Sequence, residues 1–456
     1  MKIAILGFDR QGKSAYEYWR EGNEITICDK KTSLDHLPSD VEVQLGDTYL
    51  DNLSRFDMLV RTPGLHPNKI LEANQDTPSI LDKVTSVTNE FLRVCPTKNI
   101  IGVTGTKGKG TTSTLLTEML ACAGKRVHLG GNIGIPPLDL LNGKGLYLTN
   151  KDNADINVSE KIKKDDWVVL ELANYQLIDM RYSPHIAVCL MIVPEHLDWH
   201  TDIDEYLRAK QQIFSYQTER DIAIYKANDN RSTHVASTSL GKHLPYLEQP
   251  GAVIKDDYVE INSQRIIKTN EVPLLGTHNL ENICAAVTAA WQVIQDATAI
   301  KTGIEQVTNL PHRLELITKV HGIDFYNDSI GTTPETAIAA IRAMSQPTIL
   351  ILGGSDKGIG FDQLAKEIAR STIVKEVVLI GKTGPIIEAA LEKVDYSKVS
   401  YGGETMTEAV RTAYHHAESG DVVLLSPACA SFDMFTDYED RGQQFNQAVR
   451  ALDSAA

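Results

Sequence analysis

The chain of 456 residues lacks the patterns that mark disulfide-rich, zinc-binding and membrane-spanning proteins. Its six cysteines are scattered without a C-x-x-C pair, which favours reduced, buried thiols in a cytosolic protein. No apolar run reaches about 18 residues, so we predict no membrane span. The start, Met1–Gly7, lacks the longer apolar core and small-residue cleavage site of a signal peptide, and we expect a cytoplasmic protein.

An excess of positive charge is also lacking, since 60 acidic residues outnumber 45 basic ones. The formal net charge is −15, which argues against non-specific binding to nucleic acid. Hydrophobic residues make up 42% and charged residues 23% of the chain, the proportions of a soluble globular protein. A chain of this length exceeds one ordinary core, so two or three domains are expected.

The most informative segment is the glycine-rich run Val103–Thr112. It follows a short apolar stretch and precedes a helical pattern, Ser113–Cys122. A strand, a glycine loop with a lysine and a helix together bind the phosphates of ATP or GTP. Gly105, Gly108 and Gly110 allow backbone N–H groups to turn inward, and the helix N-terminus adds its positive dipole end.

Two departures separate this run from the standard pattern G-x-x-x-x-G-K-[ST]. Val103 occupies the first glycine position, and Gly110 stands where a serine or threonine should follow Lys109. Thr111 is then the nearest hydroxyl for Mg²⁺, while Lys109 can reach the β- and γ-phosphates. The alternative is a glycine-rich surface turn with a solvated lysine, but the strand and helix flanks that the motif needs are both present.

Segments rich in Ile and Val alternate with amphipathic helical patterns along most of the chain. This alternation predicts an α/β fold with parallel sheets covered on both faces, and ligand sites beyond the carboxyl ends of the strands. Breaks near Cys95 and Asn309 predict three domains, 1–95, 96–309 and 310–456. The expected strands are Lys2–Leu6, Glu24–Cys28, Ile100–Val103, Trp167–Leu170, Ile186–Leu190, Thr348–Leu352, Val377–Ile380 and Val422–Leu425.

The first segment begins as a nucleotide-binding βα unit with the loop Gly7–Gly12. Its spacing is G-x-x-x-x-G, because Asp9 replaces the middle glycine that lets a pyrophosphate approach closely. Asp29, at the end of the second strand, can accept hydrogen bonds from ribose hydroxyls. Arg10 and Lys30 either bind phosphate at the same strand ends or are solvated loop charges.

The central segment adds candidate metal ligands. Glu171 ends the strand Trp167–Leu170, and an acid one sheet position from a phosphate loop commonly binds Mg²⁺; the alternative is a helix cap. The next strand runs into Pro194–His200, whose spacing matches no closed zinc site. His196, nearest the strand end, is preferred to His200 as a ligand that supplements oxygen atoms.

Helical patterning and strand ends mark further positions. In the helical pattern Asp204–Ile213, Lys210 shares a face with Tyr206 and Ile213, and periodicity alone predicts an exposed lysine stem. Three later loops follow apolar strands and collect small, polar and charged residues, which indicates either a pocket or ordinary loops. They are Tyr326–Glu335, Leu352–Gly358 and Leu425–Asp433.

Further motifs stand in a recognisable order: Gly130–Gly134, Tyr206 before Ala209-Lys210, Pro311–Glu315, Asn327–Ser329, and Ser426–Ser431 followed by Glu439, Arg441 and Gly442. With the phosphate loop, they resemble the Mur ligases, ATP-dependent amino-acid ligases of peptidoglycan precursor synthesis. The resemblance spans essentially the whole chain. It implies an N-terminal Rossmann-like domain for a UDP-sugar, a central P-loop domain for ATP with a mostly parallel sheet, and a C-terminal Rossmann-like domain for glutamate.

The resemblance also implies an activity. A monomer would use ATP and two Mg²⁺ sites to join glutamate, with D-glutamate expected, to UDP-N-acetylmuramoyl-L-alanine (UDP-MurNAc-L-Ala). The substrate carboxylate would attack the γ-phosphate, and the glutamate amine would displace phosphate from the acyl phosphate. ADP and phosphate would be released.

The resemblance implies roles for single residues. Catalysis and metal binding would fall to Lys109, Thr111, Glu171, His196 and Lys210, with Lys210 carbamylated. ATP would contact Gly105, Thr106, Lys107, Gly108, Lys109, Gly110, Thr111, Thr112, Asn279, Arg313 and Asp328. The nucleotide sugar would contact Arg10, Gln11, Asp29, Lys30, Gly64, Asn132 and Gln176, and glutamate would contact Thr332, Lys357, Ser431, Phe432 and Tyr438.

Some positions depart from the family pattern. Ala173–Tyr175 replaces a common Ser-Ser-Phe, and Ile330 stands where many members carry lysine. Lys107 and Gly110 also resemble the loop of folylpolyglutamate synthetases. Three alternatives follow: the same reaction with L-glutamate, a folate-type polyglutamate ligase, and a nucleotide-binding regulator without ligase chemistry. The βα unit before the phosphate loop favours a UDP-sugar substrate over a folate.

Overall fold

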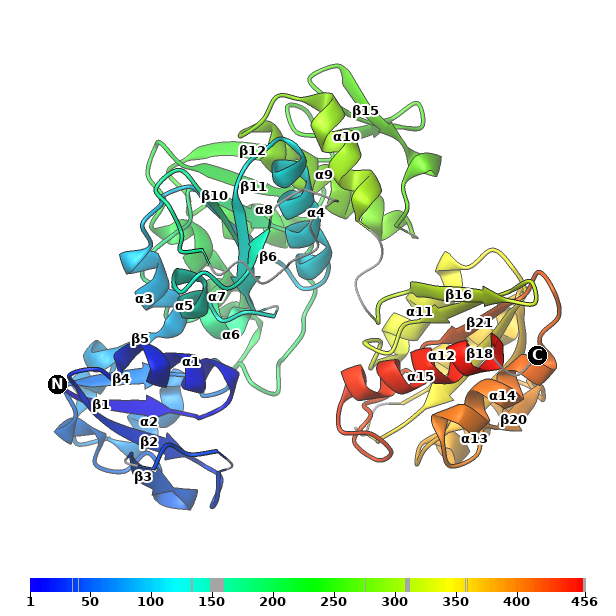
Figure 1. Cartoon of the computed structure of the whole chain (residues 1–456), viewed down its shortest axis with the longest axis horizontal. Coiled ribbons are helices and arrows are strands. Elements are labelled where there is room, and N and C mark those ends of the chain that lie inside the picture. Colours follow the sequence, from blue (N-terminus) through cyan, green and yellow to red (C-terminus); the bar gives the residue numbers. More distant parts are fainter. Residues whose placement is uncertain are drawn as a thin grey trace. The chain divides into compact units, whose positions relative to one another are not determined.

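The computed structural model describes residues 1–453 apart from 35, 40, 133, 148–159, 275, 308–311, 357 and 359. The chain forms two compact units (Figure 1). One unit contains residues 1–272 and 278–306, and the other contains residues 273–277 and 307–456. Parallel strands alternate with helices in both units, so the predicted α/β class is confirmed.

The first sheet has five parallel strands in the order β3-β2-β1-β4-β5. Asp9 is the N-cap of the helix that follows the central strand, and its carboxylate accepts the backbone N–H of Gln11 at 3.2 Å. The residue that interrupts the glycine pattern therefore begins this helix. The elements are β1 Lys2–Leu6, α1 Arg10–Trp19, β2 Glu24–Asp29, β3 Glu42–Leu45, β4 Met58–Arg61, α2 Pro67–Ala73, β5 Val84–Ser86 and α3 Val87–Val94.

The second sheet, in the order β12-β11-β10-β6-β9-β7-β8, contains the strand that leads into the phosphate loop. That strand, β6, lies between β10 and β9, and its pairs are parallel, whereas β8 runs antiparallel to β7. The strands are β6 Ile100–Thr104, β7 Val127–Gly131, β8 Leu146–Tyr147, β9 Trp167–Glu171, β10 Ile186–Cys189, β11 Ile222–Lys226 and β12 Lys242–Tyr246. The helices are α4 Lys109–Cys122, α5 Pro137–Leu141, α6 Asn174–Leu177, α7 Ile203–Ser215, α8 Asn230–Ala236, α9 Thr277–Trp291 and α10 Ala297–Gln306.

A small antiparallel sheet, β13-β14-β15, completes the first unit and was not among the expected strands. Its strands are joined by tight turns, and Asp256, Asp257, Asn262 and Ser263 have positive φ there. The strands are β13 Val253–Lys255, β14 Tyr258–Ile261 and β15 Gln264–Lys268.

The second unit contains a six-stranded sheet in the order β16-β17-β21-β18-β19-β20. All neighbours are parallel except β16, which forms a hairpin with β17. The strands are β16 Glu315–Val320, β17 Ile323–Asn327, β18 Thr348–Gly353, β19 Val374–Ile380, β20 Val399–Tyr401 and β21 Val422–Leu425. The helices are α11 Pro334–Ala343, α12 Asp362–Arg370, α13 Gly384–Glu392, α14 Met406–His416 and α15 Tyr438–Asp453.

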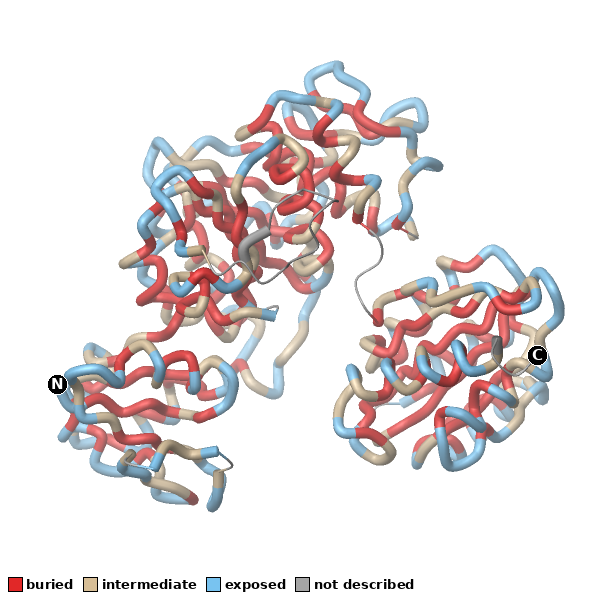
Figure 2. The backbone as a smooth tube through the Cα atoms, in the orientation of Figure 1, coloured by how far each residue is buried: buried red, intermediate tan, exposed pale blue. Residues whose placement is uncertain are grey.

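All eight predicted strands are present within three residues of their expected ends. They are buried along most of their length, as Figure 2 shows for the sheets of both units. Five of the six cysteines are buried and Cys122 is partly buried, as expected for reduced thiols. Among the described residues, no helix is both long and apolar enough to cross a bilayer.

Candidate active site

The backbone of the phosphate loop reverses direction at two glycines with positive φ, Gly105 and Gly108. Gly105 has φ +146°, and a Cβ added to it would lie 2.6 Å from the Leu190 Cβ atom. Gly108 has φ +87°, is the N-cap of α4, and packs against the Asn282 side chain. Gly110 lies inside the first turn of α4 and has no positive φ, so its backbone adopts a conformation open to other residues. The helix also begins at Lys109 rather than at residue 113, which directs its N-terminal N–H groups at the loop.

Two lysine side chains converge on one carbonyl of this loop. Lys109 Nζ donates to the Gly105 carbonyl at 3.2 Å and to the Thr106 carbonyl at 3.0 Å. Lys210 Nζ, from α7, donates to the same Gly105 carbonyl at 3.0 Å. Lys210 is only 1% exposed, so the exposed stem predicted from periodicity is wrong. Burial, reinforced by the positive charge of Lys109, lowers the pKa of Lys210 to about 7.

Buried hydroxyls surround the same loop. The Thr106 hydroxyl donates to the Val193 carbonyl at 3.0 Å and lies 2.8 Å from the Tyr206 hydroxyl. Thr111 and Thr112 are buried in the first turn of α4. The Thr112 hydroxyl makes no hydrogen bond within the described chain. Buried polar groups are normally satisfied, so a polar ligand or a water molecule beside the loop would complete the hydrogen bonding of this hydroxyl.

Glu171 lies directly beside the start of the loop. It is the last residue of β9 and pairs in register with Val103 of β6. Its buried carboxylate accepts the Asn132 side-chain N–H at 2.8 Å. The helix-cap alternative is wrong, because the N-cap of α6 is Ala173. A buried carboxylate at this sheet edge has the chemistry of a Mg²⁺ ligand.

His196 has φ +60° on the loop after β10, and its ring lies 5.0 Å from that of Tyr175. Burial lowers the pKa of His196; the charge of Glu195 raises it and that of Lys109 lowers it further. Glu195 also forms an ion pair with Lys107 of the phosphate loop. His196 therefore belongs to the same local set of charges as the loop.

Asn279 and Asn282 of α9 lie against the other side of the loop. The Asn282 side-chain N–H donates to Asn279 Oδ1 at 3.1 Å, and both residues are buried. Because Asn282 packs on Gly108, α9 positions Asn279 close to the phosphate loop.

Several of the predicted nucleotide-sugar residues form hydrogen bonds with backbone groups or with other side chains. Asp29 accepts the backbone N–H groups of Phe8 at 2.8 Å and Lys31 at 2.9 Å, which orders the two loops beyond β1 and β2. Arg10 is exposed and donates to the Gly134 carbonyl at 3.0 Å. Gln11 is partly buried, Lys30 is exposed, Gly64 is exposed, and Asn132 is exposed beside Glu171.

Gln176 is buried and forms hydrogen bonds inside the protein. Its side-chain oxygen accepts the Ala173 N–H at 3.0 Å, and its amide donates to the Thr88 hydroxyl at 3.4 Å. It links α6 to α3, so any contact with substrate competes with these bonds.

In the second unit, the loops beyond β17 and β21 meet at Asp328. Its buried carboxylate accepts the Ser426 hydroxyl at 2.7 Å and the Leu314 N–H at 3.2 Å. Burial raises the pKa of Asp328 to about 6, against the lowering effect of the Ser426 hydrogen bond and the Arg313 charge. Arg313 Nε is buried without a hydrogen bond in the described part of the chain, so this arginine is available to an anion.

Arg441 orders the neighbouring loops from α15. Its guanidinium donates to the Ser329 hydroxyl at 2.9 Å, the Ser329 carbonyl at 2.7 Å and the Cys429 carbonyl at 3.0 Å. Burial lowers the pKa of Arg441 to about 10. Of the predicted glutamate residues, Ser431 is buried, Phe432 is 73% exposed, and Thr332 and Tyr438 are partly buried. Lys357 lies outside the described residues.

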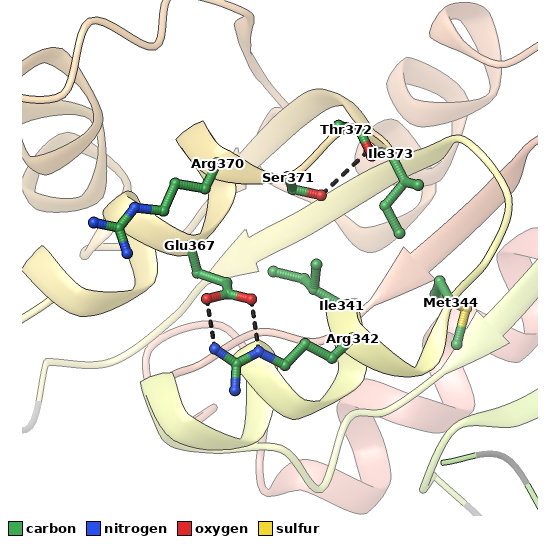
Figure 3. A pocket seen from close by; sticks show the side chains of 8 residues that line it. All are labelled: Ile341, Arg342, Met344, Glu367, Arg370, Ser371, Thr372 and Ile373. Atoms are coloured by element: carbon green, nitrogen blue, oxygen red, sulfur yellow. Dashed lines mark hydrogen bonds and ion pairs between the residues drawn. The ribbon is translucent and has the colours of Figure 1, made fainter. Parts of the chain in front are cut away.

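A shallow hollow of about 260 Å³ lies elsewhere in the second unit (Figure 3). Its lining includes Met344 and Ile373, which precede β18 and β19, and an Arg342–Glu367 ion pair with two contacts of 2.7 Å. The hollow is therefore at the amino ends of the strands. Ligands of parallel sheets bind at the carboxyl ends, so we assign it no role in the site.

Comparisons with known proteins place the chain in a family. Residues 103–290 match the Mur ligase middle domain, and residues 312–429 match the Mur ligase glutamate ligase domain. The UDP-N-acetylmuramoylalanine–D-glutamate ligase of Acetivibrio thermocellus is 36% identical over 99% of this chain and 97% of its own length. The enzyme of the same name from Clostridium tetani is 34% identical with the same coverage.

The chain belongs to the Mur ligase family. A solved structure of UDP-N-acetylmuramate-alanine ligase from Thermotoga maritima superposes with a TM-score of 0.58 over 99% of this chain and 100% of that chain, at 17% identity. The fold implied by the sequence motifs is thereby confirmed for the whole Mur ligase chain.

Sequence reasoning missed several charged contacts within the first unit. Glu195 pairs with the loop lysine, and Arg61 forms a buried bidentate ion pair with Asp179 at 2.7 and 2.8 Å. His66 and Glu205 contact each other at 3.2 Å. Their partners are distant in the sequence, and a single sequence carries no signal for such pairs. Asp202 and Glu205 do have helix-start spacing, which indicates only a cap.

Proposed function

We propose that this Mur ligase is an ATP-dependent enzyme that joins D-glutamate to UDP-MurNAc-L-Ala through an acyl phosphate. The observation that carries the proposal is the convergence of Lys109 and Lys210 on the Gly105 carbonyl, beside Glu171 on the adjacent strand. Two substrate anions must meet for a carboxylate to attack a phosphate, and amines and metal ions at that point screen their repulsion. The names of the full-length relatives support the choice of D-glutamate.

ATP and Mg²⁺ fit the residues present. The backbone N–H groups at the start of α4, the Lys109 ammonium and the Thr111 hydroxyl would hold the phosphates and a metal ion. Glu171, His196 and Lys210 would hold metal, and Asn279 would contact the adenine. When bound, Mg²⁺ supplies positive charge that stabilises the charge developing during phosphoryl transfer.

Lys210 has a second role in this proposal. Its neutral amine would attack CO₂ to form a carbamate, with loss of one proton, so that a cation becomes an anionic oxygen ligand. Only the neutral amine is nucleophilic, and a pKa of about 7 leaves a large neutral fraction at physiological pH. Burial of Lys210 supports this modification.

The remaining residues divide between the two other substrates. The segment 1–95 would bind the nucleotide sugar, 96–309 would bind ATP, and 310–456 would bind glutamate and complete the ATP contacts through Arg313 and Asp328. The substrate carboxylate attacks the γ-phosphate and ADP leaves. The glutamate amine then attacks the acyl carbon, phosphate leaves, and the amine loses a proton as the amide forms.

The alternatives are less well supported. A folate-type ligase needs no five-stranded sheet before the phosphate loop, and the full-length relatives carry the D-glutamate name. A regulator without ligase chemistry needs no buried Lys210 against the loop. Only an activity assay with each enantiomer can distinguish the use of L-glutamate from that of D-glutamate.

The test is phosphate release from ATP with UDP-MurNAc-L-Ala plus D-glutamate, L-glutamate or neither amino acid. We expect sustained release only with the nucleotide sugar and D-glutamate, together with an amide product detected by mass spectrometry. Release that does not depend on the nucleotide sugar would refute the proposal, and a preference for L-glutamate would refute the choice of enantiomer.

A further inference from the structure

Three side chains converge beside the phosphate-loop region: His66, His200 and Glu205, which we call the Glu205 cluster. His66 Nε2 lies 3.2 Å and His200 Nδ1 lies 3.4 Å from the same oxygen, Glu205 Oε2. The backbone N–H of Thr201 donates to that oxygen at 2.8 Å. The side chains of His66 and His200 are 6% and 0% exposed, and that of Glu205 is 15% exposed.

Two histidines and a carboxylate this close together are also the donor set of some zinc and iron sites. The second nitrogen of His66 decides against a metal. His66 is the N-cap of α2, and its Nδ1 accepts the backbone N–H of Asn68 at 3.1 Å. In the neutral ring the proton is then on Nε2, which leaves no lone pair there for a metal. His66 Nε2–H therefore donates to Glu205.

The cluster joins the loop after β4 to helix α7. Trp199 Nε1–H donates to the Gly64 carbonyl at 3.1 Å, and the rings of Trp199 and His66 are 4.4 Å apart. Glu205 lies in the first turn of α7, the helix that also carries Tyr206 and Lys210. Loop 62–66 and the lysine at the phosphate loop are thus attached to one rigid element.

We propose that Glu205 is a positioning residue that holds loop 62–66 in the conformation that receives the nucleotide sugar. This inference rests on the proposed function, in which Gly64 contacts that substrate. Without the negative charge of the Glu205 carboxylate, the hydrogen bond from His66 weakens and the loop is held less firmly to α7. A purely stabilising role would instead lower the active fraction and leave every KM unchanged.

The first test measures steady-state kinetics of Glu205→Gln. Glutamine keeps an oxygen acceptor but no negative charge. We expect the KM for UDP-MurNAc-L-Ala to rise about tenfold, as when a charge-assisted hydrogen bond becomes a neutral one, while kcat and the KM for ATP change by less than about twofold. Asp204→Asn is the matched control, because it removes an exposed carboxylate from the same helical turn. An unchanged KM for the nucleotide sugar, or an equal rise in both KM values, would overturn the proposal.

A double-mutant cycle isolates the contact itself. His66→Asn keeps a side-chain acceptor for the Asn68 N–H, since asparagine is a good N-cap, but removes the Nε2–H that reaches Glu205. The double variant with Glu205→Gln should raise the KM no more than the larger single change. Independent, multiplying effects of the two substitutions would show that they do not act through one contact.

A second measurement does not depend on catalysis. Hydrogen exchange of peptides covering residues 62–68 in the ligand-free full chain should be faster in Glu205→Gln than in the wild type or Asp204→Asn. If exchange of residues 62–68 is unchanged in Glu205→Gln, the Glu205 cluster does not restrain this loop, even if the enzyme is active. If exchange is faster in Glu205→Gln but the wild type shows no ligase turnover, the proposed function is refuted and the restraint by Glu205 stands. Stoichiometric zinc in the purified wild type, lost in Glu205→Gln, would overturn the hydrogen-bonded assignment.

Discussion

Burial of the charged Lys210 side chain is expected to lower the free energy of unfolding of the protein, and the Lys210→Met variant tests this. Methionine has a similar unbranched shape but no charge to bury. Burial lowers the pKa of Lys210 from 10.5 to about 7, and the Lys109 charge contributes. Such a difference corresponds to at most about 5 kcal/mol by which the folded state disfavours the ammonium. Lys210→Met should therefore be more stable than the wild type while releasing no phosphate.

The increase in unfolding free energy of Lys210→Met over the wild type must depend on pH in a defined direction. Above the ordinary pKa of 10.5, the amine is neutral in both states and its burial carries no charge penalty. As the pH falls from there, the unfolded chain takes up a proton that the folded protein resists. The penalty is complete below a pH of about 7, so the advantage of methionine should be largest there and fall to about 2 kcal/mol near pH 9.

The measurement is urea unfolding of both proteins in buffer freed of CO₂, so that Lys210 carries no carbamate. The difference in unfolding free energy isolates this residue, since all other titrating groups are shared. Lys107→Met, a change at an exposed lysine of the same loop, should alter stability by less than about 0.5 kcal/mol. A Lys210→Met protein no more stable than the wild type near pH 7, or one with the same gain near pH 9, would refute the reasoning.

Three further substitutions test the site. Lys109→Ala should lower kcat by about 10²-fold through loss of charge stabilisation, and a phosphate-release assay with near-normal kcat would contradict its role. Asp328→Asn should stabilise the protein at pH 8 by at most about 3 kcal/mol, because burial raises the pKa of this carboxyl to about 6. This gain in unfolding free energy should vanish as the pH falls toward 4. Urea unfolding at both pH values measures the gain, and an unchanged gain at low pH would contradict the assignment. Gly105→Ala should destabilise by about 1–3 kcal/mol, because its φ of +146° suits glycine and the new Cβ meets Leu190; a thermal melt like that of the wild type would show that the loop can adjust.

Local pattern was a reliable guide to the elements. Buried parallel strands appear as short runs of Ile and Val, and strands such as Lys2–Leu6 and Val422–Leu425 have the predicted ends. The sequence pattern places the start of the helix after the phosphate loop at Ser113, too late, because Gly110 resembles a turn residue; the helix begins at Lys109. Glycine is permitted in a first helical turn, and composition alone does not separate the two conformations.

The sequence points to candidate site residues only where one short segment carries the chemistry. The phosphate loop is such a segment, and so is the acid that ends β9, since strand ends gather at one sheet edge. The antiparallel sheet β13–β15 and the cap at Asp9 were not foreseen, because tertiary packing and turn geometry decide them. Lys210 was identified through family resemblance, whereas its helical spacing favoured solvent.

The sequence by itself determined the alternation of strands and helices, the phosphate loop and membership of the Mur ligase family, because these depend on neighbours a few residues apart or on motif order. Tertiary structure alone decided that Lys210 is buried on the Gly105 carbonyl, that Glu171 faces Asn132 rather than capping a helix, and that His66 contacts Glu205. The physical reason is that burial and partner choice arise between elements distant along the chain. Burial sets the pKa of Lys210, and the contact between His66 and Glu205 sets the position of loop 62–66.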